Sequence, residues 1–450
     1  MKHSYITQAA CTAIVAMAAT FTACTFEQED YFDETASLRI QHTNEDIKNT
    51  LVSHSGAGEN GWLIQYFVGG TSDYNFEGFN LFGRFYDSGK VTLSSDHRYL
   101  RNGNAGKYTE FDSNYEMLNE ESCVLAFNTW NDVLSVFVDP VDPGSAPNVL
   151  SDDGEGMNGD DRLVMLSYGP DEMLFRGERH SARVYFSKLD RTPEQYIADV
   201  KTLKNYIASD LITDYYFTNG DETWYITGLK NGYFDILDRL DDPLSDVVRS
   251  CVFTPTGFML QYNYTIGQDT CKVFSLAADS SCLVSGNIQV IPCWDTYLAD
   301  RTTLWNLDQT KFTATQQQLY TQIAAALKVY NTNYELYDIA LGKSTGGSSV
   351  KGLVLRFYTN AAKSRTNTCG LALSTARSSM GQISYTMADT PAKDANFTAI
   401  AKKATDLESL MTQFAQTLCG TYSVQPNNCF QPTSATYTPV SGGTAFRAYE

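Results

Sequence analysis

Short apolar runs that alternate with polar residues dominate the first half of the chain. In the first run, Trp62, Ile64 and Tyr66 fall on one side of an extended chain, as a period of two requires. The predicted strands are residues 61–68, 80–86, 90–94, 114–118, 123–127, 133–138, 162–168, 172–176 and 183–189. Turn sequences separate these runs and no helical pattern intervenes. The pattern predicts an antiparallel β-meander that forms a barrel or a sandwich, and it leaves that choice open.

Helical patterns lie on either side of this strand-rich region. Residues 36–53 place their apolar side chains on one helical face. A second helix is predicted over residues 192–207, because Thr-Pro-Glu-Gln supplies an N-cap, a first-turn proline and the glutamine of a capping box. We therefore predict a β-rich N-terminal domain, residues 36–190, and an α+β C-terminal domain, residues 191–450.

The second half of the chain mixes strands and helices. Asn-Gly pairs at 219–220 and 231–232 predict tight hairpins. Helices are predicted at 315–330 and 397–418, with Gly420 as the residue after the second helix. The predicted strands are residues 215–218, 223–227, 233–237, 258–262, 271–276, 288–291, 334–341, 351–358, 369–373 and 382–387. We expect an antiparallel sheet with packed helices here, so the chain as a whole is mainly β with some α (α+β).

Residues 1–23 have the layout of a signal peptide. Lys2 precedes an Ala-rich apolar stretch that is too short to span a bilayer. The stretch ends in Phe-Thr-Ala-Cys and resembles a bacterial lipobox, in which the cysteine, here Cys24, is lipidated and becomes the first residue of the mature protein. Phe21 stands where an aliphatic residue is usual. The alternative is an ordinary secretory signal cleaved near Ala19.

Acidic residues follow this cysteine and dominate the charge. The chain has 52 Asp and Glu against 33 Lys and Arg, a net charge of −19, which argues against a nucleic-acid partner. Residues 24–35 form an acidic tether. Its start resembles the export signal that sends Bacteroidetes lipoproteins to the outer face of the outer membrane. We therefore expect an outer-membrane, lipid-anchored protein that faces the cell exterior; the alternative is a plain solvated tether.

Beyond Cys24 the chain carries an even number of cysteines. They are Cys123, Cys251, Cys271, Cys282, Cys293, Cys369, Cys419 and Cys429. A secreted compartment permits disulfides, and spacings of ten or eleven residues suit bridges between neighbouring strands, with the connectivity left open. Cys123 and Cys369 lie inside apolar runs, so the alternative for them is a reduced core residue.

Motifs for catalysis are scarce, and we predict no catalytic residues. The Gly-x-Ser-x-Gly at 342–346 precedes a strand instead of the helix that a nucleophile elbow needs. The loop 151–161 combines Asp, Asn and Gly, which suits Ca²⁺, although its register is not that of an EF-hand. Its candidate calcium ligands are Asp152, Asp153, Asp160 and Asp161. The alternative is a solvated acidic loop, and no other cofactor is predicted.

Three segments together resemble a known family. They are the Gly-Trp-Leu-Ile start at 61–64, the Leu-Ala-Phe-Asn-Thr-Trp-Asn run at 125–131, and Gly-Asp-Asp at 159–161 before a strand. They are similar to the DUF4302 family of uncharacterised Bacteroidetes lipoproteins, well over roughly residues 30–190 and loosely beyond. Asn158 stands where a glycine is more usual, and the extra cysteines are unusual.

The resemblance implies a cell-envelope lipoprotein without an established activity. Relatives tend to be encoded beside SusC/SusD-like outer-membrane uptake systems, which implies a transporter of that type as a partner. We accordingly predict a non-catalytic, surface-exposed lipoprotein that binds a ligand, such as a glycan or peptide, or a partner. One alternative is a structural or adhesive envelope protein, which predicts a large exposed apolar patch. The other is a carboxylate-based glycan or peptide hydrolase, which predicts two facing carboxylates in a pocket.

Overall fold

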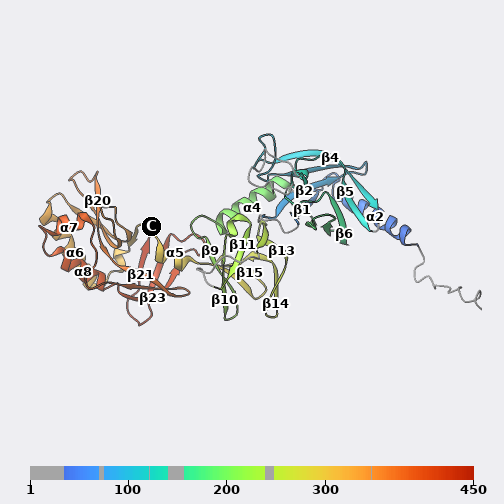
Figure 1. Ribbon diagram of the computed structural model, residues 1–450. Helices are drawn as coiled ribbons and strands as arrows, with labels where there is room; N and C mark the ends of the chain where they lie inside the picture. The colour runs from blue at the N-terminus through green and yellow to red at the C-terminus, as the bar shows by residue number, and fades with distance from the viewer. Residues whose placement is uncertain (1–34, 70–75, 121, 140–156, 239–247, 346) are drawn as a thin grey trace, which may run out of the picture.

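Three units lie in a row in the computed structural model, which describes residues 35–69, 76–120, 122–139, 157–238, 248–345 and 347–450 (Figure 1). Two are closed eight-stranded barrels, and the third is a nine-stranded sheet with helices. The first barrel and its N-terminal helix lie at one end of the row, and the C-terminal unit lies at the other. The predicted class is confirmed, and of the two predicted forms of the meander the chain adopts the barrel.

The first barrel is a meander in which β1 pairs with both β2 and β8 and so closes the sheet. Its strands are β1 (Trp62–Phe67), β2 (Phe79–Phe85), β3 (Lys90–Ser95), β4 (Thr109–Asn119), β5 (Cys123–Phe127), β6 (Arg162–Tyr168), β7 (Glu172–Gly177) and β8 (Arg183–Lys188). Helix α2 (Ala36–Ser53) packs against β2, β4 and β5. Trp62 joins the helix to the barrel, because its Nε1 donates a hydrogen bond to the Leu51 carbonyl oxygen at 2.9 Å.

The predicted strand at residues 133–138 is wrong. The chain turns there and forms a short helix, α3 (Ser135–Val138). Asn131 fixes the turn, because its Oδ1 accepts the Val133 N–H at 3.0 Å and its carbonyl oxygen accepts the Ser135 N–H at 2.7 Å. Phe137 then stacks on Tyr66 with 5.3 Å between ring centroids. The apolar residues of this run therefore enter the core at helical spacing instead of alternating along a strand.

Helix α4 (Pro193–Ile207) leads into the second barrel and begins as predicted, with Thr192 as N-cap and Gln195 completing the capping box. Strand β9 pairs with β10 and β16 and closes this barrel. Its strands are β9 (Asp214–Asn219), β10 (Glu222–Thr227), β11 (Tyr233–Leu237), β12 (Arg249–Phe253), β13 (Gly257–Ile266), β14 (Asp269–Leu276), β15 (Leu283–Ser285) and β16 (Ile288–Pro292). Strands β12 and β15 are absent from the predicted strands, and β15 has only three residues, too few to show an alternation.

Both predicted Asn-Gly hairpins form, and only the first has a tight turn. The pair at 219–220 connects β9 directly to β10. The pair at 231–232 instead ends a single 3₁₀ turn, η1 (Leu229–Asn231), that connects β10 to β11. Gly232 has a φ of +79°, and a Cβ at this position would lie 2.3 Å from the Glu77 Cβ of the first barrel. Glycine is therefore needed here both for the backbone conformation and for the close approach of the two barrels.

The two barrels contact each other through hydrogen bonds and apolar packing. The Gly78 N–H donates to the Cys251 carbonyl oxygen at 2.9 Å. The Tyr185 hydroxyl donates to the Gln261 carbonyl oxygen at 2.7 Å. Phe67 of the first barrel belongs to one apolar cluster with two side chains of the second barrel. These contacts hold the barrels against each other.

The C-terminal unit is a curled antiparallel sheet in the order β20-β19-β18-β17-β25-β24-β23-β22-β21. Its strands are β17 (Trp305–Leu307), β18 (Glu335–Lys343), β19 (Lys351–Tyr358), β20 (Thr366–Ala372), β21 (Ser374–Ser379), β22 (Gln382–Thr386), β23 (Gly420–Pro426), β24 (Ser434–Pro439) and β25 (Phe446–Tyr449). The helices are α5 (Trp294–Asp300), α6 (Ala314–Tyr330), α7 (Ala395–Ala401) and α8 (Leu407–Gln416), with the 3₁₀ turn η2 (Gln309–Lys311). The last strands of the chain thus lie in the middle of the sheet.

The single helix predicted at 397–418 is two helices. The chain turns at residues 402–406, between α7 and α8, so that both apolar faces pack into the same core. Asp394 starts α7, since its carboxylate accepts the Phe397 N–H at 2.7 Å. Gly420 does not follow the helix end as predicted, because α8 ends at Gln416 and Gly420 begins β23.

The C-terminal unit is attached to the second barrel at two buried points. Phe430, from the loop between β23 and β24, is 2% exposed and joins the apolar core of the barrel. Its ring packs on Tyr206 of α4 with 5.3 Å between centroids. Asp295 of α5 is fully buried, and its carboxylate accepts the Tyr216 hydroxyl and the Gly381 N–H, both at 2.8 Å. These contacts connect the two units.

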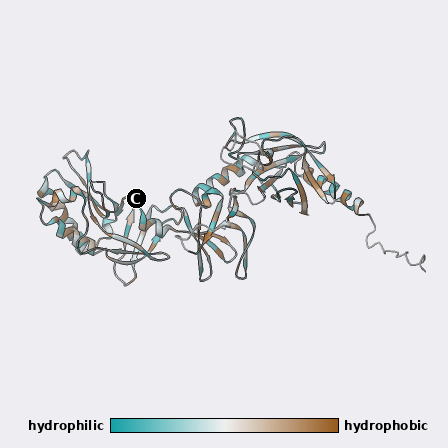
Figure 2. Cartoon of the chain, in the orientation of Figure 1, coloured by the Kyte–Doolittle hydropathy of each residue, from teal (hydrophilic) through white to brown (hydrophobic). Residues whose placement is uncertain are grey.

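Each unit has its own apolar core. Figure 2 shows apolar residues along the strands of both barrels and on the helices of the C-terminal unit, interspersed with polar ones. Within the part of the chain that the structure describes, no helix is both long enough and apolar enough to cross a membrane.

Candidate functional site

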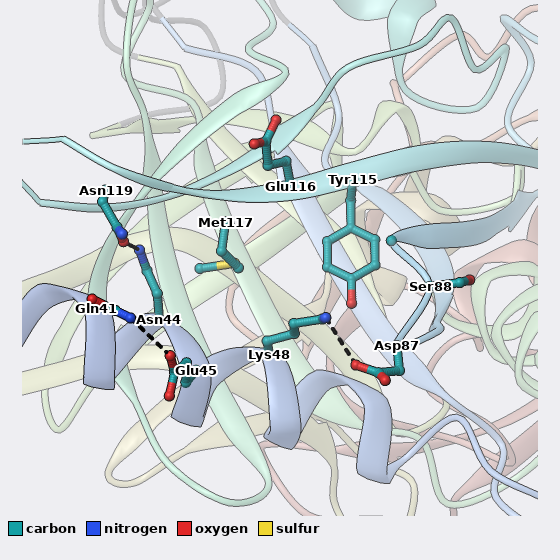
Figure 3. A pocket seen from close by; sticks show the side chains of 11 residues that line it. Gln41, Asn44, Glu45, Lys48, Asp87, Ser88, Tyr115, Glu116, Met117 and Asn119 are labelled. Atoms are coloured by element: carbon teal, nitrogen blue, oxygen red, sulfur yellow. Dashed lines mark hydrogen bonds and ion pairs between the residues drawn. The ribbon is translucent and has the colours of Figure 1, made fainter.

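A pocket of about 420 Å³ lies between helix α2 and the rim of the first barrel, a volume in the range of small-molecule sites (Figure 3). We call it the α2 pocket. Three elements form it: helix α2, the turn between β2 and β3, and strand β4. The lining residues are Gln41, Asn44, Glu45, Lys48, Asp87, Ser88, Gly89, Tyr115, Glu116, Met117 and Asn119.

Strand β4 closes one side of the α2 pocket. Tyr115 and Met117 point from the strand toward α2, whereas Glu116 points away from the helix, as strand alternation requires (Figure 3). The Tyr115 hydroxyl donates to the Tyr86 carbonyl oxygen at 3.1 Å, and burial, helped by the charge of nearby Asp87, raises its pKa to about 12. Tyr115 is only 4% exposed, so its ring belongs to the core and offers a ligand no stacking face.

Charged and amide groups of α2 form the opposite side. Lys48 and Asp87 form an ion pair at 2.9 Å, and Gln41 Nε2 donates to Glu45 Oε1 at 3.3 Å. The Asp87 side chain is 86% exposed, so this pair contributes little to stability. These groups are therefore free to exchange their present partners for a ligand at small cost.

Asn44 brings a buried acceptor to the α2 pocket. The residue is 5% exposed, and its Nδ2 donates to the Leu118 carbonyl oxygen at 3.0 Å and to Asn119 Oδ1. Its own Oδ1 is buried and has no hydrogen-bond partner among the described residues. A buried acceptor without a donor costs about 1–3 kcal/mol. A ligand that donates a hydrogen bond to this oxygen would remove that cost.

A smaller pocket of about 200 Å³ lies where the first barrel, α4 and the second barrel meet. Ion pairs connect α4 to the first barrel here: Lys201 lies 2.5 Å from Asp96, and Lys204 lies 3.8 Å from Glu77. Because these charges neutralise one another, we assign them to holding α4 against the first barrel.

His97 is buried at the edge of this junction pocket. Its Nε2 lies 2.9 Å from the Val133 carbonyl oxygen and therefore carries the proton, while Nδ1 accepts the Tyr99 N–H at 3.3 Å. Its ring centroid lies 4.9 Å from that of Phe137. Burial lowers the pKa of His97 to about 4, so the imidazole is neutral at physiological pH.

We expect the stability of the first barrel to fall as the pH decreases from about 6.5 toward 4. An unfolded chain has a histidine pKa of about 6.5, so between these values the unfolded state binds the additional proton. Above pH 6.5 His97 is neutral in both states and the free energy of unfolding has its full value. At pH 4.5 the protonation of this histidine in the unfolded chain lowers the free energy of unfolding by about 2–3 kcal/mol. Urea unfolding at pH 7.5 and 4.5 should show a smaller loss for His97→Gln than for the wild type.

His42, which is exposed on α2, provides the control. His42→Gln should keep the pH dependence of the wild type. An equal loss in wild type and His97→Gln would show that other groups cause the acid sensitivity.

Three of the residues predicted from the sequence lie outside the described residues: Cys24, Asp152 and Asp153. Their predicted roles in lipidation and calcium binding stay predictions. In the part of the chain that is described, no three His, Cys, Asp or Glu side chains are grouped as metal ligands would be.

The other two calcium candidates occupy different environments. Asp160 is 3% exposed, and its carboxylate accepts backbone N–H groups of Arg179, His180 and Ala182 at 2.9, 3.0 and 3.0 Å. Asp161 is partly buried, and burial raises the pKa of its carboxyl group. Asp160 therefore connects the β5–β6 side of the barrel to the turn between β7 and β8, which is a structural role.

The predicted disulfides between neighbouring strands do not form: all eight body cysteines are free thiols in the structure. Cys282 faces Ala277 across the β14–β15 turn, whereas Cys271 lies six residues further along β14, roughly 20 Å away at the rise of a strand. The alternative that Cys123 and Cys369 are reduced core residues is confirmed, because both are buried free thiols. Burial raises the pKa of both thiols.

The sequence did not predict the α2 pocket. Asp-Ser-Gly at 87–89 is one of the turn sequences between the predicted strands, and Lys48 lies in the helix predicted at 36–53. No local signal connects them, because the helix, the turn and β4 meet only after the barrel closes.

Comparison with known proteins gives a family match over most of the two barrels. A family model described as DUF4302, a domain of unknown function, matches residues 28–278. The match spans α2, the first barrel and the second barrel as far as β14, and it excludes the C-terminal sheet. It therefore extends well past residues 30–190, the range over which the sequence motifs indicated a good resemblance to this family. No curated protein matches the sequence. Since the match covers more than half of its length, the chain belongs to the DUF4302 family.

Proposed function

We propose that this protein is a non-catalytic, lipid-anchored protein of the outer membrane surface that binds a ligand in the α2 pocket. The observation that carries the proposal is Asn44, a residue that lines a pocket of ligand size and whose buried Oδ1 is an acceptor without a donor. The exchangeable pairs of Lys48 with Asp87 and of Gln41 with Glu45 add donors and acceptors beside it.

The lining favours a neutral ligand rich in hydroxyl groups. Two carboxylates, those of Glu45 and Asp87, outnumber the single cation of Lys48, and Glu116, which points away from α2, adds a third negative charge nearby. This balance repels anions. Carboxylate and amide oxygens accept hydrogen bonds from hydroxyl groups, and the amides and the lysine donate to them. A sugar unit of a glycan has this chemistry, so we propose a glycan as the ligand.

The hydrolase alternative is not favoured by these carboxylates, because each has a partner in the protein. Glu116 accepts Asn128 Nδ2 at 2.8 Å, and Asp87 is paired with Lys48. Glu45 accepts a hydrogen bond from Gln41. A general acid in such an enzyme is instead a carboxyl group whose surroundings favour the protonated form.

The position of the pocket suits a tethered binding protein. Helix α2 begins directly after residues 24–34, which can extend over at most about 40 Å. The C-terminal unit lies at the opposite end of the row (Figure 1). If Cys24 is lipidated, the α2 pocket lies within reach of the membrane surface, where a SusC/SusD-like transporter would accept the captured glycan.

The ligand proposal is tested by isothermal titration of the mature chain with neutral, anionic and cationic oligosaccharides. We expect a neutral oligosaccharide to bind, and Lys48→Met to weaken its binding by about tenfold, as expected for a lost charge-assisted hydrogen bond. Lys328→Met, at an exposed lysine on α6, is the matched control and should bind like the wild type. Equal affinity in both variants, or binding only of anionic oligosaccharides, would contradict the proposal.

The partner proposal has a separate test. The tagged protein is purified from mildly solubilised outer membranes, and its companions are identified by mass spectrometry. We expect a SusC/SusD-type transporter in the eluate. Recovery of the protein alone would argue against an accessory role in uptake, while leaving the result of the ligand titration unaffected.

A further inference from the structure

Arg301 is a buried cation in the C-terminal unit, at the end of helix α5, and it is only 6% exposed. Its Nη1 donates to the Leu298 carbonyl oxygen at 2.6 Å and to the Tyr437 hydroxyl at 3.2 Å. Its guanidinium carbon lies 4.7 Å from the Trp305 ring centroid. These contacts hold the side chain in one position, and all of them are with neutral groups.

No carboxylate among the described residues forms an ion pair with Arg301. The nearest acidic residue in sequence, Asp300, is 76% exposed and lies 3.6 Å from Lys351 Nζ instead. A guanidinium group stays charged in proteins. A buried charge is stable only when a counter-charge and hydrogen bonds compensate for the lost hydration. The protein groups around Arg301 provide hydrogen bonds but no negative charge.

Arg301 also lines a small cavity with unused donors. The cavity measures about 10 Å³, which is room for one water molecule or one monatomic ion. Arg301 Nε is buried and has no hydrogen-bond partner among the described residues. Tyr385, which is 2% exposed and lines the same cavity, lies near the guanidinium, but its hydroxyl completes no hydrogen bond of normal geometry.

The surroundings of the cavity favour an anion over water. Lys351 also lines it, but its Nζ donates to the Ala299 carbonyl oxygen at 2.6 Å and is paired with Asp300 at 3.6 Å, so the uncompensated charge at the cavity is that of Arg301. The rest of the lining is formed by aliphatic residues, by Thr375 and by the facing glycines Gly342 and Gly352. A water molecule would satisfy the two free donors but would leave the charge of Arg301 uncompensated.

We propose that Arg301 and Tyr385 bind a single halide ion, chloride under physiological conditions, in the core of the C-terminal unit. The ion accepts hydrogen bonds from Arg301 Nε and from the Tyr385 hydroxyl, and its charge balances the guanidinium. Carboxylate, sulfate and phosphate groups are too large for a cavity of this volume. The halide would thus be a structural ion that stabilises the attachment of α5 to the sheet.

The test compares the full mature chain in sodium chloride and in sodium gluconate at equal ionic strength. We expect chloride to raise the midpoint of thermal unfolding by about 3 °C or more. Tyr385→Phe should lose most of this shift, because it removes one donor while keeping the ring. Tyr422→Phe is the matched control: its ring centroid lies 6.0 Å from that of Tyr385, but its hydroxyl donates to the Leu418 carbonyl oxygen, so the chloride shift should persist.

Crystals grown in sodium bromide give the direct measurement. We expect an anomalous bromide peak within hydrogen-bond distance of Arg301 Nε. A water molecule at that place, or a chloride shift of equal size in Tyr385→Phe and Tyr422→Phe, would overturn the proposal. If Arg301→Met does not fold, the two tyrosine variants carry the test without it. The cavity lies in a different unit from the α2 pocket, so the result is independent of the proposed function.

Discussion

Replacing Cys24 by serine is expected to release the protein from the membrane fraction. In the lipobox interpretation, Cys24 carries the acyl chains, and each buried methylene contributes about 0.8 kcal/mol to membrane binding. Several such chains together hold a protein firmly at a membrane. Incorporation of an alkyne fatty acid should therefore fall to background, a decrease of roughly tenfold or more, and the protein should appear in the soluble fraction.

The N-terminal segment provides its own matched control. Cys11 lies within the apolar stretch of the same segment, so Cys11→Ser should leave labelling and membrane association unchanged. Labelling of the Cys24→Ser protein at the level of the wild type would refute the anchor. Release of the wild-type protein from cells by external protease would in turn support exposure on the cell surface.

Asp160→Ala is expected to lower the free energy of unfolding of the first barrel by about 3–5 kcal/mol. The Asp160 carboxylate accepts backbone N–H groups from Arg179, His180 and Ala182, and it is almost completely buried. Alanine would leave those three donors without partners, and the N–H of Ala182 is buried. Tyr66 adds to the connection, since its hydroxyl donates to the Asp160 carbonyl oxygen at 2.9 Å.

Asp161→Asn is the control for Asp160, and urea unfolding in the presence of a chelator is the measurement. Burial raises the pKa of Asp161, which means that folding disfavours its charged form, so neutralising it should leave stability unchanged or slightly higher at pH 7. A small effect of Asp160→Ala would argue against the structural role. If calcium raised the stability of the wild type and not that of Asp160→Ala, the loop at 151–161 would be a calcium site after all.

Local sequence patterns predicted most of the strands and the start of α4. The strands at residues 123–127, 162–168 and 351–358 have the predicted bounds, because each combines β-forming residues with a turn signal at its end. The capping box at Thr192 formed as expected, since its hydrogen bonds connect residues only three positions apart. Interactions of this range are specified by neighbouring residues alone.

The segments whose structure was predicted wrongly from neighbouring residues make their decisive contacts with residues far away in the sequence. The apolar run at 133–138 has the composition of a strand, but Phe137 finds its stacking partner in Tyr66, far away in the sequence. The cysteine spacings suggested bridges, yet strand register separates Cys271 from Cys282. The helix predicted at 397–418 breaks in two because both halves must face one core.

The sequence by itself determined the class of fold, the strand meander and the signal-like N-terminus, because alternation, turn residues and hydropathy act over a few neighbouring positions. Only the tertiary structure decided that the meander closes twice into barrels, since closure depends on pairing between β1 and β8 and between β9 and β16. The same holds for the α2 pocket and for the cavity beside Arg301. Their residues come from elements that come into contact only when the sheets close, so the spacing of these residues in the sequence does not predict the contact.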